Sequence, residues 1–189
     1  MWCTQIGGKY HPDDDTIFRL KQSLSRLGVS VSHPIADEIK TFVDGQGFAF
    51  DPTVLTFTQV EHDYYDSIKE SEFHVVANQF ETHLGYLGGS ASLEMAYAMC
   101  QRRPIVLLHQ ASFSTRVEDT VREFLQPRLC QVVVHNFLTA PPESSIALIA
   151  AIGGRSVDYD VSSQGKILIE SRVRALLEGI QLKVTDVAP

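Results

Sequence analysis

The residues best suited to chemistry lie in one short segment, Gly85 to Ala98, which reads Gly-Tyr-Leu-Gly-Gly-Ser-Ala-Ser-Leu-Glu-Met-Ala-Tyr-Ala. Its three glycines, Gly85, Gly88 and Gly89, allow the backbone to come close to a ligand. Ser90 and Ser92 follow where a helix is predicted to begin, and either is a candidate for its N-cap. The free N–H groups of that first turn, together with the helix dipole, favour binding of a phosphate or another anion.

Glu94 is the one carboxylate of this segment, four positions after Ser90, so the two side chains share roughly one helix face. A carboxylate there suits attack on an electron-poor sugar carbon, or stabilisation of it, because cleavage of an N-glycosidic bond passes through an oxocarbenium-like state. The alternative is that Glu94 only stabilises the N-terminus of its helix. Spacing alone leaves both interpretations open.

Strand and helix patterns alternate along the chain and must position this segment. Strands are predicted at residues 2–6, 29–35, 73–77, 104–108 and 130–134, and helices at 17–27, 53–71, 90–101, 117–125, 144–152 and 166–180. Residues 37–52 and 78–89 are predicted to be loops. Because the central strands are apolar on both faces, we expect an α/β fold: a single domain over residues 1–189, a three-layer sandwich with a mostly parallel five-stranded sheet of the flavodoxin or Rossmann-like kind.

Composition excludes several classes of function. The net charge of −7 argues against a protein that binds nucleic acid polymers, which needs a basic surface. The longest apolar runs are too short to span a membrane, and the start of the chain lacks a signal-peptide pattern. Three widely spaced cysteines indicate reduced thiols, with Cys100 in a packing position. We therefore expect a cytoplasmic protein with no membrane partner.

Ligands of parallel α/β sheets bind beyond the carboxyl ends of the strands. This rule selects two places in the chain. One is Gly7-Gly8-Lys9-Tyr10 after the first predicted strand, and the other is the loop that runs from Asn78 to Ser92 after the third.

The segment 85–98, followed by Pro104-Ile-Val-Leu-Leu, resembles the nucleoside 2-deoxyribosyltransferase family and its relatives, the 2-deoxynucleoside 5-phosphate N-hydrolases. That family carries a glycine-bearing loop, then Glu-x-Gly-Tyr-Ala on a helix, then a Lys-Pro or similar turn into a strand. Here the match is Glu94-Met95-Ala96-Tyr97-Ala98 with Arg103-Pro104, and Ala96 replaces the usual glycine. The resemblance covers about the first 110 residues in pattern, and only the glutamate segment is specific. It implies that Glu94 is the nucleophile that takes the deoxyribosyl group.

The resemblance also suggests partners for Glu94. The family's first loop lines the base and sugar site, which implicates Gly7, Gly8 and Tyr10. The family has an aspartate on the preceding helix, about four residues before an isoleucine like Ile68, where this chain has Tyr64. Asp63, Asp66 or Glu61 are alternatives for the second acid, which would protonate the leaving base, and Asp63 is nearest the family position. Each of the three also suits a solvated helix face.

The expected site therefore has Glu94, Asp63 and Asp66 as catalytic candidates. The expected substrate contacts are Gly7, Gly8, Tyr10, Asn78, Gly85, Gly88, Gly89, Ser90 and Ser92. Tyr64 shares helical spacing with Val60 and Ile68, which predicts a core position. His11 with residues 13–15 has the composition of a metal site, but acidic residues before a helix more simply cap it, so no metal and no cofactor are expected.

The expected function is cleavage or transfer at the N-glycosidic bond of a nucleoside or nucleotide, the small-molecule partner of this chain. One alternative is a nucleotide-binding module without catalysis. Another is a phosphoribohydrolase of the cytokinin-releasing type, whose Pro-Gly-Gly-x-Gly-Thr-x-x-Glu loop is only partly matched by residues 87–94. Apolar positions in residues 144–152 and 166–180 favour a homo-oligomer.

Overall fold

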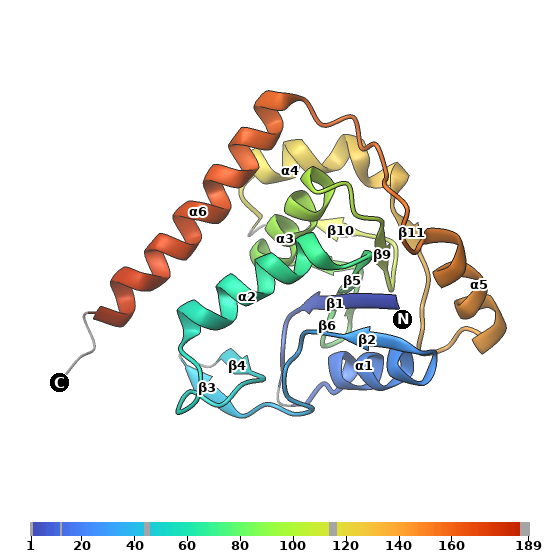
Figure 1. Ribbon diagram of the computed structural model, residues 1–189, viewed down its shortest axis with the longest axis horizontal. Helices are drawn as coiled ribbons and strands as arrows, with labels where there is room; N and C mark the ends of the chain where they lie inside the picture. The colour runs from blue at the N-terminus through green and yellow to red at the C-terminus, as the bar shows by residue number, and fades with distance from the viewer. Residues whose placement is uncertain (1, 12, 44–45, 114–116, 186–189) are drawn as a thin grey trace.

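A five-stranded parallel sheet forms the centre of the molecule. The computed structural model describes residues 2–11, 13–43, 46–113 and 117–185 (Figure 1). The strands are β1 (Trp2–Gly8), β2 (Val29–Val31), β5 (Phe73–Ala77), β9 (Ile105–Leu107) and β11 (Val133–Val134). Their order across the sheet is β11-β9-β5-β1-β2, and every neighbouring pair is parallel. This confirms the predicted α/β fold with a parallel sheet.

Helices cover both faces of the sheet. The core beneath α1 (Thr16–Arg26) and α5 (Pro142–Ile152) is separate from the core beneath α2 (Phe57–Glu70), α3 (Gly89–Cys100), α4 (Asp119–Leu125) and α6 (Ser163–Thr185). The 23-residue α6 packs on α2 and α3, and its C-terminal end runs away from the sheet (Figure 1). None of the described helices combines the length and apolarity needed to cross a membrane.

Strand order determines where a ligand can bind. The sheet follows the 2-1-3-4-5 order of flavodoxin-like folds, in which the chain direction of the crossovers reverses between the first and third strands. Those strands are β1 and β5 here, and Gly8 pairs with Ala77 at their carboxyl ends. The crevice beside Gly8 and Ala77 is therefore the expected ligand position in this fold.

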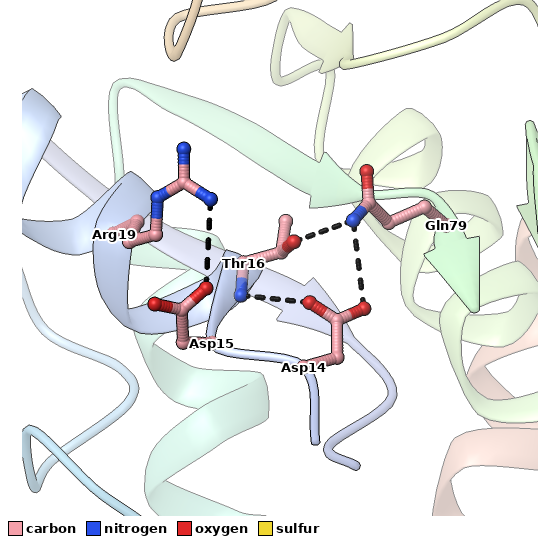
Figure 2. Close-up of polar contacts among 5 residues, drawn as sticks. All are labelled: Asp14, Asp15, Thr16, Arg19 and Gln79. Carbon is pink, nitrogen blue, oxygen red and sulfur yellow. Dashed lines mark hydrogen bonds and ion pairs between the residues drawn. The ribbon is translucent and has the colours of Figure 1, made fainter. Parts of the chain in front are cut away.

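The acidic residues before α1 hold its first turn. Asp14 accepts a hydrogen bond from the Thr16 backbone N–H at 2.9 Å, and the Gln79 amide donates to the Thr16 hydroxyl and, at 3.4 Å, to the Asp14 carboxylate (Figure 2). Asp15 forms an ion pair with Arg19 one turn later at 3.5 Å. Asp14 thus satisfies one N–H of the helix start, whereas Asp15 occupies the N-cap position without a side-chain cap hydrogen bond.

The segment predicted as a loop over residues 37–52 contains an antiparallel pair, β3 (Thr41–Val43) and β4 (Gln46–Phe48). Phe48, Phe50 and Phe57 pack edge to face, with Phe57 at 4.8 Å from each of the other two ring centroids. This aromatic cluster holds the hairpin against the start of α2. Strands of three residues have too few positions to show a two-residue period, which explains why the prediction was wrong here.

Several predicted boundaries also differ from the structure. The loop 78–89 contains β6 (Gln79–Phe80), β7 (His83–Leu84) and β8 (Tyr86–Leu87), and β8 pairs with β10 (Ser112–Phe113). The 3₁₀ helix η1 (Gln126–Gln131) takes the first two residues of the fifth predicted strand, 130 and 131, and β11 is formed by the last two. α3 begins at Gly89 with Gly88 as its N-cap, so neither Ser90 nor Ser92 caps it, because both already lie inside the helix.

The central strand β9 provides a test of the core. Leu107 is fully buried and belongs to the hydrophobic cluster that also contains residues of α2, α3, α4 and α6. We expect Leu107→Ala to lower the free energy of unfolding by about 2–5 kcal/mol, because it removes buried methyl groups and leaves a cavity. Denaturant unfolding followed by circular dichroism measures this. Leu84→Ala is the matched control: Leu84 is 62% exposed, and its loss should cost less than about 0.5 kcal/mol. Equal losses in the two variants would contradict the packing described here.

Candidate functional site

Glu94 lies in the wall of a small cavity at the carboxyl end of β1. Its position on the second turn of α3 directs its carboxylate toward the crevice between β1 and β5, and α2 and the β3–β4 hairpin supply the other walls. The cavity has a volume of about 100 Å³ and combines two carboxylates with aromatic and aliphatic side chains. Its lining residues are Ile6, Gly8, Tyr10, His33, Pro34, Ile35, Phe48, Ala49, Phe50, Val60, Glu61, Tyr64, Ser90 and Glu94.

The carboxylate of Glu94 is held by a single hydrogen bond. The Tyr64 hydroxyl donates to its Oε2 at 2.8 Å, and no cation pairs with Glu94 among the described residues. Gly7 allows this arrangement, because a Cβ at that position would collide with the same Oε2 and would lie 2.9 Å from the Tyr64 hydroxyl. Gly7 therefore contributes by its lack of a side chain, which lets the end of β1 come against the carboxylate.

Burial changes the ionisation of both carboxylates of the cavity. It raises the pKa of Glu94 to about 8; the hydrogen bond from Tyr64 opposes this rise, and the nearby charge of Glu61 adds to it. Burial also raises the pKa of Glu61. Two carboxyl groups in one poorly solvated cavity are difficult to ionise together, so the cavity retains a proton near neutral pH.

The second carboxylate of the cavity is Glu61. It is half-buried, and no hydrogen-bond or ion-pair partner reaches it within the described part of the chain. Asp63 and Asp66, the sequence-predicted candidates, are both exposed, and Asp66 pairs with Lys69 at 2.8 Å. Neither lines the cavity. Glu61 and Tyr64 are three residues apart and share one face of α2, and that face is turned toward Glu94.

A second cavity, of about 180 Å³, adjoins the first one at the start of α3. The two cavities share Gly8 and Ser90. The second is lined by Gly8, Lys9, Ala77, Tyr86, Gly88, Gly89, Ser90 and Ala91. The Lys9 ammonium lies 3.9 Å from the centre of the Phe80 ring and has no carboxylate partner among the described residues. A lysine beside the first turn of a helix provides an electropositive environment suited to an anion.

The structure brings together most of the predicted substrate contacts. Gly8, Tyr10 and Ser90 line the first cavity, and Gly88 and Gly89 line the second. The other four predicted contacts, Gly7, Asn78, Gly85 and Ser92, line neither cavity and have structural positions.

Asn78 and Gly85 fix the conformation of the segment before α3, and Ser92 lies inside α3 itself. The Asn78 side chain donates to the His109 carbonyl at 2.8 Å and accepts from the His109 N–H at 2.9 Å, which joins the ends of β5 and β9. Gly85 has a φ of +81°, and a Cβ there would collide with the Gln110 carbonyl. Ser92 is fully buried within α3.

Sequence patterns missed two polar residues of the first cavity. The helical spacing of Tyr64 predicted a core position, yet its hydroxyl contacts Glu94. His33 followed the second strand as part of a turn with Pro34 and carried no other signal, yet it lines the same cavity. Its neighbour across the sheet edge is Ile6, whose N–H donates to the His33 carbonyl at 2.9 Å.

In the described residues, no group of three or more His, Cys, Asp or Glu side chains is arranged so that it could hold a metal ion. The polar side chains that line the first cavity are Glu94, Glu61, Tyr10, Tyr64, His33 and Ser90. We found no match to this chain among protein-family models, curated proteins or solved structures.

Proposed function

We propose that this protein cleaves or transfers at the N-glycosidic bond of a nucleoside or nucleoside 5-phosphate, with Glu94 as the nucleophile. The observation that carries the proposal is the position of Glu94: it lies in a cavity at the carboxyl end of β1, beside a second carboxylate and without a cation partner in the described structure. A carboxylate that only stabilised its helix would need neither the cavity nor Glu61. The resemblance of residues 85–98 to the deoxyribosyltransferases points to the same reaction.

The reaction would proceed in two steps. Ionised Glu94 attacks the anomeric carbon of the sugar, the bond from that carbon to the base nitrogen breaks, and its electron pair leaves with the base. The reactive form of the pair is the singly protonated one with its proton on Glu61, and Glu61 donates this proton to the departing base. In the second step, water or an acceptor base attacks the glycosyl ester, Glu61 takes the proton from the attacking group, and Glu94 is released as a carboxylate.

Two adjoining cavities favour a nucleoside 5-phosphate over a free nucleoside. The first cavity has the apolar and aromatic walls that suit a base and a sugar. The second has Lys9 and the first turn of α3, which suit a phosphate. Gly8 and Ser90 line both cavities, so the cavities adjoin. A nucleotide whose base and sugar fill the first cavity would therefore place its 5-phosphate in the second.

Base release from a panel of ribo- and deoxyribonucleosides and their 5-phosphates tests the proposal. We expect at least one member of the panel to release free base, which chromatography detects. If the enzyme transfers the sugar, a second base added to the assay should increase the amount of the first base released. The absence of base from every member would contradict the proposal.

Lys9 is expected to act on phosphorylated substrates alone. Lys9→Ala should raise KM for a nucleoside 5-phosphate by roughly 10-fold, the usual weight of a charge-assisted hydrogen bond, and should leave KM for the free nucleoside unchanged. Steady-state kinetics on both substrates measures the ratio. Lys40→Ala, at an exposed lysine outside both cavities, is the matched control. An equal effect of Lys9→Ala on the two substrates would contradict a phosphate contact.

A second candidate function is nucleotide binding without catalysis. It is favoured by the raised pKa of Glu94, because burial keeps much of this carboxyl neutral and therefore non-nucleophilic at pH 7. Calorimetric binding of nucleotides with no release of base would favour it. The cytoplasmic location and the homo-oligomeric state expected from the sequence belong to the main proposal.

A further inference from the structure

The imidazole of His33 is a buried polar group that the chain itself leaves without a partner. His33 is 7% exposed and lines the same cavity as Glu94 and Glu61. Neither its Nδ1 nor its Nε2 has a hydrogen-bond partner among the described residues. Because buried polar side-chain atoms are nearly always hydrogen-bonded, two such nitrogens in the wall of one cavity point to a ligand that supplies the bonds.

The ring of His33 is held in a defined position. Its carbonyl accepts from the Ile6 N–H, and its ring packs edge-on against Tyr64 with 5.3 Å between the ring centroids. The following residues are anchored as well, since the Lys21 ammonium donates to the Ile35 carbonyl at 3.1 Å and pairs with Asp37 at 2.7 Å. A ring fixed before the ligand arrives loses little conformational freedom on binding.

We propose that His33 recognises the heterocyclic base of the substrate through a hydrogen bond between one of its ring nitrogens and the base. This inference rests on the proposed function, because it assigns the base to the part of the cavity that His33 lines. Pro34, Phe48 and Phe50 line the cavity with His33 and form apolar walls suited to a flat ring. The substrate class is thus a nucleotide whose base presents a hydrogen-bonding group to His33.

The charge state of His33 fits this role. Burial lowers the pKa of His33; the charge of Asp63 raises it and that of Lys21 lowers it. The neutral imidazole has one N–H donor and one nitrogen acceptor, whereas the charged ring would have two donors and no acceptor.

Binding to a catalytically silent protein tests the proposal. Glu94→Gln would prevent turnover, and calorimetry would then compare a nucleoside 5-phosphate with ribose 5-phosphate, which has no base. In this background, we expect His33→Phe to raise Kd for the nucleotide by roughly 10- to 100-fold, because the base loses hydrogen bonds in a buried site. Kd for ribose 5-phosphate should change less than about twofold. His33→Asn retains a donor and an acceptor and should have the smaller effect on the nucleotide.

The outcomes separate this inference from the proposed function. Equal weakening of both ligands, or no weakening of the nucleotide, would overturn the role of His33 and leave the chemistry of Glu94 standing. If His33→Phe does not fold, the ratio measured with His33→Asn decides by the same criterion. If the native protein releases no base but His33→Phe still selectively loses the nucleotide, the reaction is wrong and the base contact is supported. Failure of the native protein to bind any nucleotide overturns both.

Discussion

Glu94→Gln is expected to reduce base release by on the order of 1000-fold or more, because an amide cannot form the glycosyl ester that divides the reaction into two steps. Single-turnover assays with the best substrate of the panel measure the loss. Glu123→Gln makes the same change at an exposed position on α4 and should leave the rate unchanged. Full activity of Glu94→Gln would exclude the proposed nucleophile.

The same substitution is expected to stabilise the fold, with a defined dependence on pH. The pKa of Glu94 rises from an ordinary value of 4.5 to about 8 on folding, so the unfolded chain ionises first as the pH increases. Native stability is therefore lost between pH 4.5 and pH 8, and the full cost of the buried charge is present above pH 8. Glutamine carries no charge and avoids that cost.

Thermal and denaturant unfolding at several pH values measure this effect. We expect the free energy of unfolding of Glu94→Gln to exceed that of the native protein by on the order of 2 kcal/mol at pH 8, with little difference at pH 4. A gain in stability with a loss of activity is typical of a functional residue held in an unfavourable environment. A pH-independent difference would indicate that the carboxyl is not buried as described.

Glu61→Gln is expected to have the second largest effect, lowering kcat/KM by roughly 100- to 10,000-fold, because the leaving base would depart without a proton. Asp63→Asn is the matched control, two residues away on the exposed side of α2, and should change kcat/KM by less than about threefold. A substrate whose base already carries a positive charge, such as an N7-methylated purine nucleotide, needs no proton and should be much less affected by Glu61→Gln.

The pH profile gives an independent measurement of the role of Glu61. The native enzyme needs one carboxylate and one carboxylic acid, so kcat/KM should follow a bell-shaped curve with its falling limb near the pKa of about 8. Without an acid at position 61, the residual activity should only require ionised Glu94 and should rise with pH through the same region. A loss of activity in Asp63→Asn as large as that in Glu61→Gln would contradict the assignment of the second acid.

The carboxyl end of β1 connects the architecture of the sheet to the geometry of the site. Gly7 lies against the Tyr64 hydroxyl and the Glu94 carboxylate, and a side chain at this position would displace the carboxylate. The strand order reverses between the parallel neighbours β1 and β5, and the ends of both strands line the second cavity together with the start of α3. The position of the proposed nucleophile, residue 94, thus depends on the glycine at position 7.

The sequence by itself determined the architecture and the position of Glu94. Apolar strands alternating with amphipathic helices admit few folds besides a covered parallel sheet, and the rule that ligands bind at the carboxyl ends of its strands locates Gly8 and the start of α3. The glycines before Ser90 and the spacing from Ser90 to Glu94 are local features. Such local features can be recognised in the sequence without knowledge of the elements that pack against them.

Only the tertiary structure decided which residues accompany Glu94. Glu61, Asp63 and Asp66 have similar patterns on one helix, and the rotation of α2 against the sheet turned Glu61 inward and left the two aspartates in solvent. The same rotation packs the Tyr64 ring against the core, as predicted, and brings its hydroxyl to the Glu94 carboxylate. His33 reached the cavity through the pairing of the segment after β2 with β1. These contacts join residues far apart in the chain, and a pattern along the chain carries no information about the rotation of one packed element against another.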